Sequence, residues 1–397
     1  MVTPRGFTLL EMVVVLTILA LLATVAVRSL DGQLDQSKYD ATISGMQNIQ
    51  DAVIGPANQR LPDGMVSVTG FVADMGRLPQ VLPVKQADGV TPVTISTLQS
   101  DGTTVARNVN GPVELWSNPN GFFPFEQRRA NSSEVAATDQ DSDVYVPCGW
   151  RGPYLRLGIG QTDPRDGWGN PYDFLLPNRN VCNGTLNDAA NLIGILRSNG
   201  ANGLADNAPA AGYDPDLYVN FNTLVFNGTT AANDYPAVAA SDSYHGNVRG
   251  DILAVDSTTS PATIDSPLTA NGYVCVRYFG PRPDGKGIVA ITVPDNGNGV
   301  VSAPDPSNGN ATIYSKTVND VTLSVSIDTT TRPLKTVVSY SVSNATIGPR
   351  VIRAYQGGTA FPVLSQTVLP TTPPTAKSAP ATIVITNGGS QKDLIIR

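Results

Sequence analysis

The sequence predicts an α+β protein, in which a long amino-terminal helix packs on an antiparallel sheet and an all-β, sandwich-like domain follows. Three observations support this fold class. An apolar run near the amino terminus continues into an amphipathic stripe, as a long helix requires. Only four of the 33 acidic residues are Glu, and Asp favours turns and strand ends over helices. Short strand-like runs separated by turns fill the second half of the 397-residue chain, as in β-sandwiches.

The apolar run comprises residues 7–27, and its only charged residue is Glu11. At about 1.5 Å per residue such a helix would span roughly 30 Å, the thickness of a bilayer core. A secretory signal peptide would be shorter and would end in an A-x-A cleavage site, which this run lacks. The run therefore predicts a transmembrane or filament-core helix, with a plain membrane anchor as the simplest alternative.

Glu11 argues against a plain anchor. A carboxylate in a lipid-facing helix costs about 2.5–3.5 kcal/mol at the bilayer centre, so such residues are retained where a partner supplies the opposite charge. The run contains no Lys or Arg. We therefore expect the partner of Glu11 to come from outside the run, for example from the α-amine of a neighbouring copy.

The string Arg5-Gly6-Phe7-Thr8-Leu9-Leu10-Glu11, followed by an unbroken apolar helix, resembles the amino-terminal motif of type IV pilins and type II secretion pseudopilins. The resemblance implies a leader of residues 1–6, cut between Gly6 and Phe7 by a prepilin peptidase that also methylates Phe7. It implies that Glu11 pairs with the terminal amine of an adjacent subunit. It further implies an inner-membrane assembly platform as a partner, and an inner-membrane location with a periplasmic globular part before the subunit enters a filament.

Residues 28–55 predict an amphipathic continuation of this helix. Apolar residues recur there at three to five positions, Gly32 and Gly45 weaken the pattern, and Gly55-Pro56 ends it. No Pro lies within residues 7–55, so we expect no kink of the kind that is frequent in the family.

Residues 56–216 are predicted to form a pilin-like globular domain. Residues 57–144 are rich in turns, with short strands at 90–95 and 103–105, and predict an excursion on the domain surface. Two segments that combine aromatic residues with Gly and Pro, Gly149–Leu155 and Asp166–Leu175, predict turns that feed core strands. The second segment resembles the W-G-x-P-Y region of the major pseudopilin, and we expect its role to be structural.

The loop from Ser198 to Asp216 resembles the loop in which major pseudopilins hold calcium, an ion that prefers six to eight oxygen ligands. The resemblance implies Asn202, Asp206, Asp214 and Asp216 as ligands. Asn202 stands where the family has Asp, which removes one negative charge. An ordinary turn of Asn, Asp and Gly is the alternative interpretation.

Residues 217–397 are predicted to form the β-rich carboxyl-terminal domain. The expected strands are 273–279, 288–292, 321–327, 336–343, 351–355, 382–386 and 393–396. The last two are separated by Asn387-Gly388-Gly389 and predict a closing hairpin. A stretch rich in Pro and Thr, residues 369–380, predicts a linker or an extended crossing segment.

Three cysteines fall in the part expected outside the inner membrane, where disulfides persist. Cys148 and Cys182 bracket the expected pilin-like sheet and are the preferred pair. Cys275 lies in an expected strand and is interpreted as a buried thiol.

The composition excludes several other functions. The net charge of −7 argues against a nucleic-acid partner, because phosphates need a basic surface. One His and three Cys leave little for a zinc site, and a Ser-His-Asp triad would need His245, which is expected in a polar loop. The G-x4-G-K match at Gly280–Lys286 lacks the following Ser or Thr of a phosphate loop and predicts a hairpin turn.

The sequence thus favours a structural subunit, not an enzyme, that assembles into a type IV pilus or a type II secretion pseudopilus. One alternative is a membrane-anchored periplasmic binding or enzymatic module, and another is a tip-located minor pilin or adhesin. Glu11 separates the first alternative from assembly, because a plain tether gains nothing from a buried acid.

Overall fold

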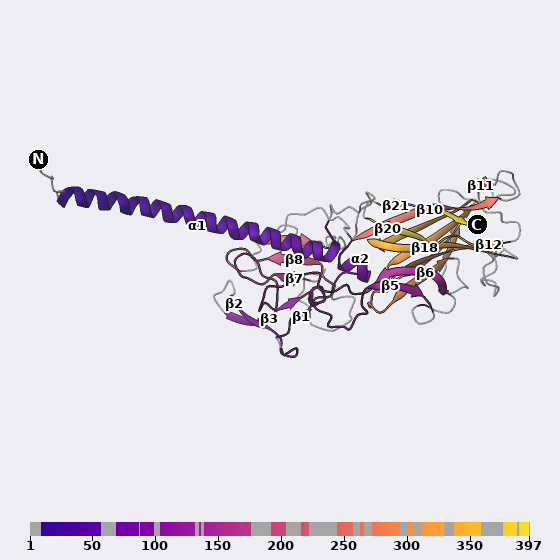
Figure 1. Cartoon of the computed structure of the whole chain (residues 1–397), viewed down its shortest axis with the longest axis horizontal. Coiled ribbons are helices and arrows are strands. Elements are labelled where there is room, and N and C mark those ends of the chain that lie inside the picture. Colours follow the sequence, from indigo (N-terminus) through magenta and orange to yellow (C-terminus); the bar gives the residue numbers. More distant parts are fainter. Residues whose placement is uncertain are drawn as a thin grey trace, which may run out of the picture.

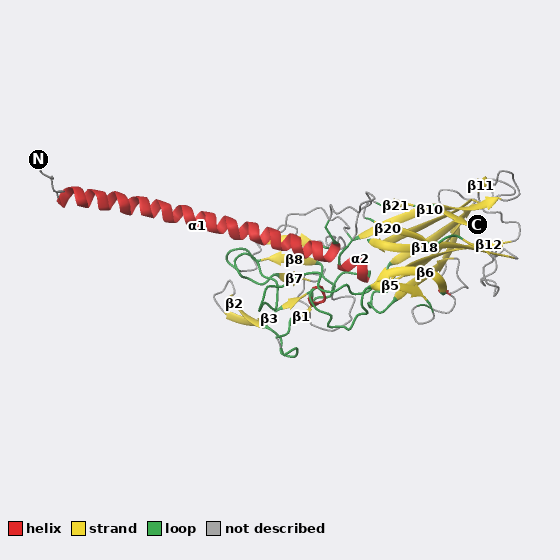
Figure 2. Cartoon of the chain, in the orientation of Figure 1, coloured by secondary structure: helices red, strands yellow, loops and turns green. Residues whose placement is uncertain are grey.

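A computed structural model describes most of the chain. The described residues are 9–56, 69–86, 88–98, 104–131, 135, 139–175, 192–203, 216–221, 244–256, 263–265, 272–293, 301–304, 311–328, 337–358, 376–386 and 389–396. Within them, the side chains of residues 25–31, of the whole segments 263–265 and 301–304, and of several strand ends are not described. The protein is α+β, with a long amino-terminal helix and mostly antiparallel sheets in the carboxyl-terminal part (Figures 1 and 2).

The helix α1 (Leu9–Ile54) has 46 residues and runs without interruption. At about 1.5 Å per residue it is roughly 70 Å long. Its first half projects away from the rest of the molecule (Figure 1). The helix ends where predicted, because Gly55 adopts a φ of 96° that most residues avoid and Pro56 cannot continue the hydrogen-bond ladder.

The second half of α1 packs against the short helix α2 (Phe71–Met75), the chain around α2 and a small sheet, and together they form one hydrophobic core. Met46, Ile49 and Val53 are buried against α2 and against the chain around it. They also meet an antiparallel sheet of three strands in the order β7-β8-β9. These strands are β7 (Asp173–Leu175), β8 (Ile195–Ser198) and β9 (Leu217–Asn220).

Three small strand pairs lie between α2 and β7. They are β1 (Leu82–Pro83) with β4 (Asn110–Gly111), β2 (Thr94–Leu98) with β3 (Thr104–Asn108), and β5 (Glu126–Ala130) with β6 (Asp141–Cys148). The 3-10 turn η1 (Val113–Leu115) connects the first two pairs to the third. The expectation of a mere surface excursion is wrong for the β5–β6 hairpin. Its residues Ala130, Val144 and Val146 are buried against the carboxyl-terminal part, so burial of apolar surface overrides the turn-rich local sequence.

The described residues of the carboxyl-terminal part form two sheets. The larger has the order β11-β10-β17-β16-β15-β14, and β21 and β22 pair with β10 in parallel. The smaller has the order β13-β12-β18-β19, with β20 also on β18. The strands are β10 (His245–Asp256), β11 (Thr263–Asp265), β12 (Gly272–Pro281), β13 (Ile288–Val293), β14 (Val301–Pro304), β15 (Ala311–Val318), β16 (Val321–Asp328), β17 (Val337–Thr346), β18 (Gly348–Gly358), β19 (Ala376–Lys377), β20 (Ala381–Ile385), β21 (Ser390–Gln391) and β22 (Leu394–Ile396).

The two sheets share one hydrophobic core. Val325 and Tyr340 of the larger sheet pack with Tyr278, Ile291 and Ile352 of the smaller one. Apolar side chains alternate with hydroxyls along the strands of the larger sheet, so one face of each strand is buried and the other faces outward. The β5–β6 hairpin covers the opposite face of the smaller sheet, where it meets Phe279, Ile288 and Val351.

Two predictions about this part are wrong. The last two strands form no hairpin, because β20 pairs with β18 in the smaller sheet and β22 pairs with β10 in the larger. Ile385 and Leu394 then face the shared core from opposite sides, which buries both strands. His245 does not lie in a polar loop, because it opens strand β10 opposite Thr346. The match at Gly280–Lys286 forms the turn between β12 and β13, as predicted.

Candidate functional site

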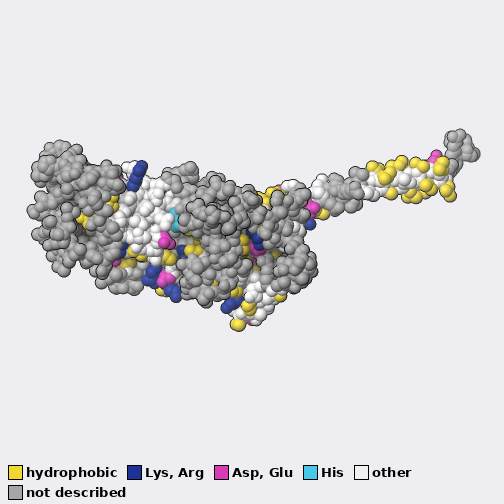
Figure 3. All heavy atoms as spheres, turned by 180° about the vertical axis from the view of Figure 1, so that it is seen from behind, with side chains coloured by type: hydrophobic (Ala, Val, Ile, Leu, Met, Phe, Trp, Pro, Cys, Tyr) yellow, Lys and Arg dark blue, Asp and Glu magenta, His cyan; other side chains and the backbone are white. Residues whose placement is uncertain are grey.

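The first half of α1 presents apolar side chains to its surroundings. Leu9 is 83% exposed and Leu21 65%, and the residues between them are exposed as well (Figure 3). Thr17 and Thr24 donate their hydroxyl hydrogens to the carbonyl oxygens of Val13 and Ala20, both at 2.8 Å. The two hydroxyls are therefore satisfied within the helix and do not interrupt its apolar surface.

Of the predicted assembly residues, Glu11 lies on the first described turn of α1 and is exposed. Gly6 and Phe7 lie outside the described residues. When only the described residues are considered, no helix is both long enough and apolar enough to cross a membrane.

The segment Asp166–Leu175 fixes the second half of α1 to the globular part. The hydroxyl of Tyr172 donates to the carbonyl oxygen of Thr42 at 3.1 Å, and the amide of Gly167 donates to the hydroxyl of Thr42 at 2.9 Å. A Cβ at Gly45 would collide with the hydroxyl of Tyr172, and one at Gly167 with the carbonyl oxygen of Lys38. Glycine at both positions therefore permits the close approach of helix and turn.

Arg197 on β8 lies between the carboxylates of Asp173 and Asp216, just before the start of the loop predicted to bind calcium. Its Nη2 lies 2.6 Å from Asp173 Oδ2, and its Nη1 lies 3.9 Å from Asp216 Oδ2. Asp216 Oδ2 also accepts the hydroxyl hydrogen of Tyr218 at 2.8 Å. Burial lowers the pKa of Arg197, but the two carboxylates outweigh it and raise that pKa. Asp173 and Asp216 thus already face a positive charge.

The start of the same loop is held by Asp166. Its Oδ2 accepts the hydroxyl hydrogen of Ser198 at 2.9 Å, and its Oδ1 accepts the amides of Trp168 and Asn170. Burial raises the pKa of Asp166, although these hydrogen bonds oppose the shift. The turn before Gly203 is therefore held in place by hydrogen bonds from the W-G-x-P-Y segment, which precedes it in the sequence.

The structure describes only two of the four predicted calcium ligands. Asn202 is exposed on the turn after β8, and Asp216 directly precedes β9. Asp206 and Asp214 lie outside the described residues. Within the described ranges, no three His, Cys, Asp or Glu side chains lie close enough to hold a metal ion.

The cysteines are placed as follows. Cys148 ends strand β6 and is buried, and its thiol donates to the carbonyl oxygen of Gly287 at 3.7 Å. Cys275 is buried on β12 beside Tyr355, as predicted for a core strand. Cys182 lies outside the described residues, so the pairing of Cys148 with Cys182 stays a prediction.

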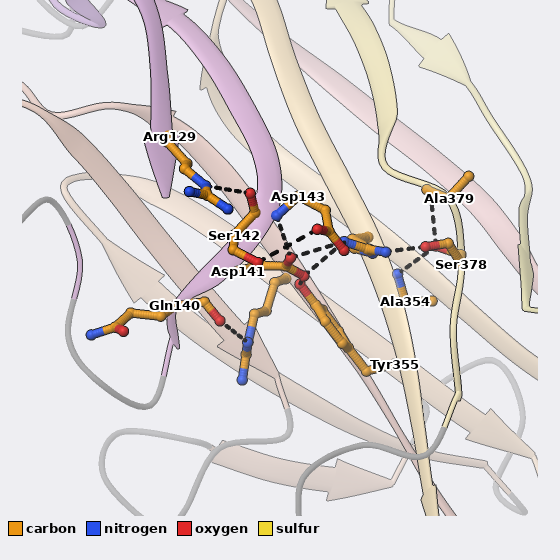
Figure 4. A network of polar contacts seen from close by, with 11 residues as sticks. Arg129, Gln140, Asp141, Ser142, Asp143, Ala354, Tyr355, Ser378 and Ala379 are labelled. Carbon is orange, nitrogen blue, oxygen red and sulfur yellow. Dashed lines mark hydrogen bonds and ion pairs between the residues drawn. The ribbon is translucent and has the colours of Figure 1, made fainter. Parts of the chain in front are cut away.

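A buried ion pair that sequence reasoning missed joins the β5–β6 hairpin to the smaller sheet (Figure 4). Arg353 Nη1 lies 2.9 Å from both carboxylate oxygens of Asp141, and Tyr355 donates its hydroxyl hydrogen to Asp141 Oδ2 at 2.6 Å. Arg353 Nε donates to the carbonyl oxygen of Ser378 at 2.7 Å. Burial, and then the hydrogen bond to Asp141, raise the pKa of Tyr355.

A second buried cation, Arg350, joins the sheets to α2. Its side chain is fully buried, and Nη1 donates to the carbonyl oxygen of Ala73 at 2.9 Å. Nη2 donates to the hydroxyl of Thr346 at 2.7 Å. Burial lowers the pKa of Arg350. The carboxylate of Asp74, the next residue of α2, accepts hydrogen bonds from Arg151 and Tyr154.

Comparison with known proteins identifies one region. Residues 3–27 match the family described as the prokaryotic N-terminal methylation motif. No curated protein and no solved structure matches the chain. The match includes Gly6, Phe7 and Glu11 and ends at residue 27, within the first half of α1. The amino terminus of this chain therefore carries the prokaryotic N-terminal methylation motif, consistent with the type IV pilin and pseudopilin family.

Proposed function

We propose that the chain is a structural pilin-like subunit that assembles into a type IV pilus or a type II secretion pseudopilus. The match of residues 3–27 to the methylation motif carries this proposal. It is supported by the apolar half of α1, which projects from the globular part with most of its side chains exposed. An apolar surface of this length is stable only when lipid or other subunits cover it.

The subunit would first reside in the inner membrane, with residues 7–27 in the bilayer and the globular part in the periplasm. A prepilin peptidase would cut between Gly6 and Phe7 and methylate Phe7. An assembly platform would then transfer the helix from lipid into a filament of pilin subunits. The continuous helix supports this transfer, because its apolar surface can pack against lipid and against neighbouring helices alike.

Glu11 would guide the incoming subunit. Cleavage creates an α-amine at Phe7, only four residues before Glu11 in the same chain. In a staggered array of helices, the carboxylate of one subunit would pair with the amine of the next. The pair would offset the free-energy cost of holding either charge in an apolar surrounding. Because the pair forms in only one register, it would set the axial position of each new subunit.

Calcium would bind in the loop between Ser198 and Asp216, with Asn202, Asp206, Asp214 and Asp216 as oxygen donors. The described residues fit this site only partly, because Arg197 already faces Asp216. The ion would compete with the guanidinium group, so we propose weak binding of the kind found in extracellular modules, with a Kd of about 10⁻⁴–10⁻³ M.

A tip-located minor subunit or adhesin is the second candidate function. The large carboxyl-terminal part favours it, since two sheets with their own core exceed what helix packing in a shaft requires. A membrane-anchored binding or enzymatic module is the remaining alternative. Such a module would need neither cleavage after Gly6 nor an acid at position 11.

Mass spectrometry of the mature amino terminus tests the proposal. We expect a chain that begins at Phe7 and carries one methyl group on its α-amine. A chain that still begins at Met1, or one cut after Ala26, would contradict the assembly proposal and favour an anchor or a signal peptide. Helical reconstruction of native filaments would then separate a shaft subunit from a tip subunit.

A further inference from the structure

The outer face of the larger carboxyl-terminal sheet consists mainly of hydroxyl side chains. Strand register aligns them in two rows that cross the sheet, Gln391–Arg249–Ser341–Ser324–Ser315 and Asp251–Ser339–Ser326–Ile313. Residues of opposite parity, such as Val325 and Val342, fill the core. In Figure 3 the described surface of the carboxyl-terminal part shows a broad white area, the colour of the backbone and of side chains that are neither apolar nor charged.

The residues of the two rows, except Ser315, line a hollow with a volume of about 600 Å³. This volume lies within the range of small-molecule sites, roughly 300–1,000 Å³. Serines at the centre of the rows are short, whereas Arg249 and Gln391 at one side and Ile313 at the other are long. The difference in side-chain length creates the depression, and one positive and one negative residue lie within it.

Several polar groups of the hollow are available to a ligand. Ser324 shares a hydrogen bond of 2.8 Å with Ser315. By contrast, the hydroxyls of Ser326, Ser339 and Ser341 make no hydrogen bond with any residue that the structure describes. Within the same ranges, the guanidinium of Arg249 and the carboxylate of Asp251 form no ion pair.

We propose that this hollow binds an extended, neutral oligosaccharide. Serine hydroxyls both donate and accept hydrogen bonds, as sugar hydroxyls do. Asp251 can accept two adjacent sugar hydroxyls, and Arg249 can donate to a further pair of oxygens. The two charged residues of the lining, Arg249 and Asp251, have opposite signs, so an anionic ligand meets Asp251 and a cationic one meets Arg249. A neutral ligand meets neither penalty.

The dimensions of the sheet fit a glycan chain. Neighbouring strands lie about 4.8 Å apart, roughly the length of one hexose unit in an extended chain. The five strands from β21 to β15 therefore offer a track of about 19 Å, enough for about four sugar units. The ring of Tyr340 belongs to the core and its hydroxyl donates to the carbonyl oxygen of Lys392. Without an aromatic platform from Tyr340, we expect weak binding, with a Kd of about 1 mM.

The site lies at the end of the molecule opposite the free tip of α1 (Figure 1). Sugar binding would thus be independent of helix packing, and its failure would leave the assembly proposal unaffected. It would give the carboxyl-terminal part a role in either a shaft or a tip subunit.

Saturation-transfer NMR on the full mature chain, in a detergent without sugar headgroups, tests the proposal. The probes are neutral tetraoses of glucose, mannose and galactose, with a tetramer of galacturonic acid as the charged comparison. We expect saturation transfer to at least one neutral tetraose and weaker transfer to the acidic tetramer. No transfer to any neutral tetraose, or stronger transfer to the acidic one, would overturn the proposal.

Variants locate the binding. Asp251→Asn should weaken binding about tenfold or more, because it replaces one accepting carboxylate oxygen with an amide nitrogen that only donates and removes the charge from the remaining hydrogen bond. Ser339→Ala should weaken binding about threefold to tenfold, because it removes a hydroxyl that would bond to the ligand. Ser343→Ala is the matched control, since Ser343 lies on the same strand and outside the hollow. An equal loss in the control would reject this location. Self-association that Asp251→Asn abolishes would assign the face to a second copy instead and would also overturn the proposal.

Discussion

Glu11 is the residue whose substitution separates assembly from membrane insertion. Glu11→Ala and Glu11→Gln both remove the carboxylate, so the helix becomes more apolar and should insert normally. Filament yield should fall strongly, because the terminal amine of the incoming subunit loses its partner in a low-dielectric surrounding. Immunoblots of membrane and sheared-filament fractions measure the two steps separately. Normal filament yield from the Glu11→Ala variant would contradict the proposed pairing.

At the scale of single residues, the sequence predicted only those functional residues whose role shows in their immediate sequence context. Glu11 was predictable because a lone acid in an apolar run is informative by itself. Asp141 and Arg353 were not, because 212 residues separate them and each resembles an ordinary surface charge in its own segment. Only the packing of the β5–β6 hairpin on the smaller sheet buries them together.

At the scale of elements, the two helix glycines offer a matched pair. A Cβ at Gly45 would collide with the hydroxyl of Tyr172, which is fixed by its bond to Thr42, whereas a Cβ at Gly32 meets nothing within 4 Å. We expect Gly45→Ala to lower the free energy of unfolding by about 1–3 kcal/mol through overpacking. Gly32→Ala should raise helix stability by up to about 1 kcal/mol.

Urea denaturation of a soluble variant that begins at Arg28 measures both changes. This truncation leaves the packed half of α1 intact, since its first residue in the core cluster is Met46. A stabilising effect of Gly45→Ala would show that Tyr172 does not fix the helix to the globular part.

The calcium loop is the second element with a testable property. In the same soluble variant, millimolar calcium should raise the melting temperature by a few degrees, because ligand at about ten times Kd adds only ~1–2 kcal/mol. Magnesium should substitute poorly, since it requires tighter octahedral geometry. Asp214→Ala combined with Asp216→Ala should abolish the shift. If calorimetry of the wild-type chain shows neither a shift nor heat of binding, the loop is an ordinary turn closed by Arg197.

Elements with a strong local pattern were predictable, and those that depend on distant partners were not. The helix and strands β12, β13 and β16 follow apolar periodicity, and their predicted bounds lie close to the observed ones. Strand β10 was missed because Gly246 and Gly250 lower its strand propensity. Both glycines are needed there, since a Cβ would collide with the carbonyl oxygens of Thr386 and Lys392 in segments that follow more than 130 residues later.

On the scale of the whole molecule, the carboxyl-terminal part is tied to the helix-bearing part at several places. Arg350 reaches from β18 to the carbonyl oxygen of Ala73 on α2, and the β5–β6 hairpin covers the smaller sheet. Ile347, between β17 and β18, is buried in the same cluster as Met46 of α1. Core residues of the two parts thus contact each other. We therefore expect helix α1 and the carboxyl-terminal part to unfold as one cooperative unit.

These contacts predict that the soluble variant beginning at Arg28 unfolds in one calorimetric transition. Asp141→Ala should disrupt this coupling, because it leaves Arg353 buried without its carboxylate and costs about 3–5 kcal/mol. Asp143→Ala is the control on the same strand. Its carboxylate lies 3.6 Å from Arg353 but is 52% exposed, so the loss should stay below about 1 kcal/mol. Two separate transitions in the wild-type chain, or equal losses in both variants, would show that the buried pair does not join the two parts.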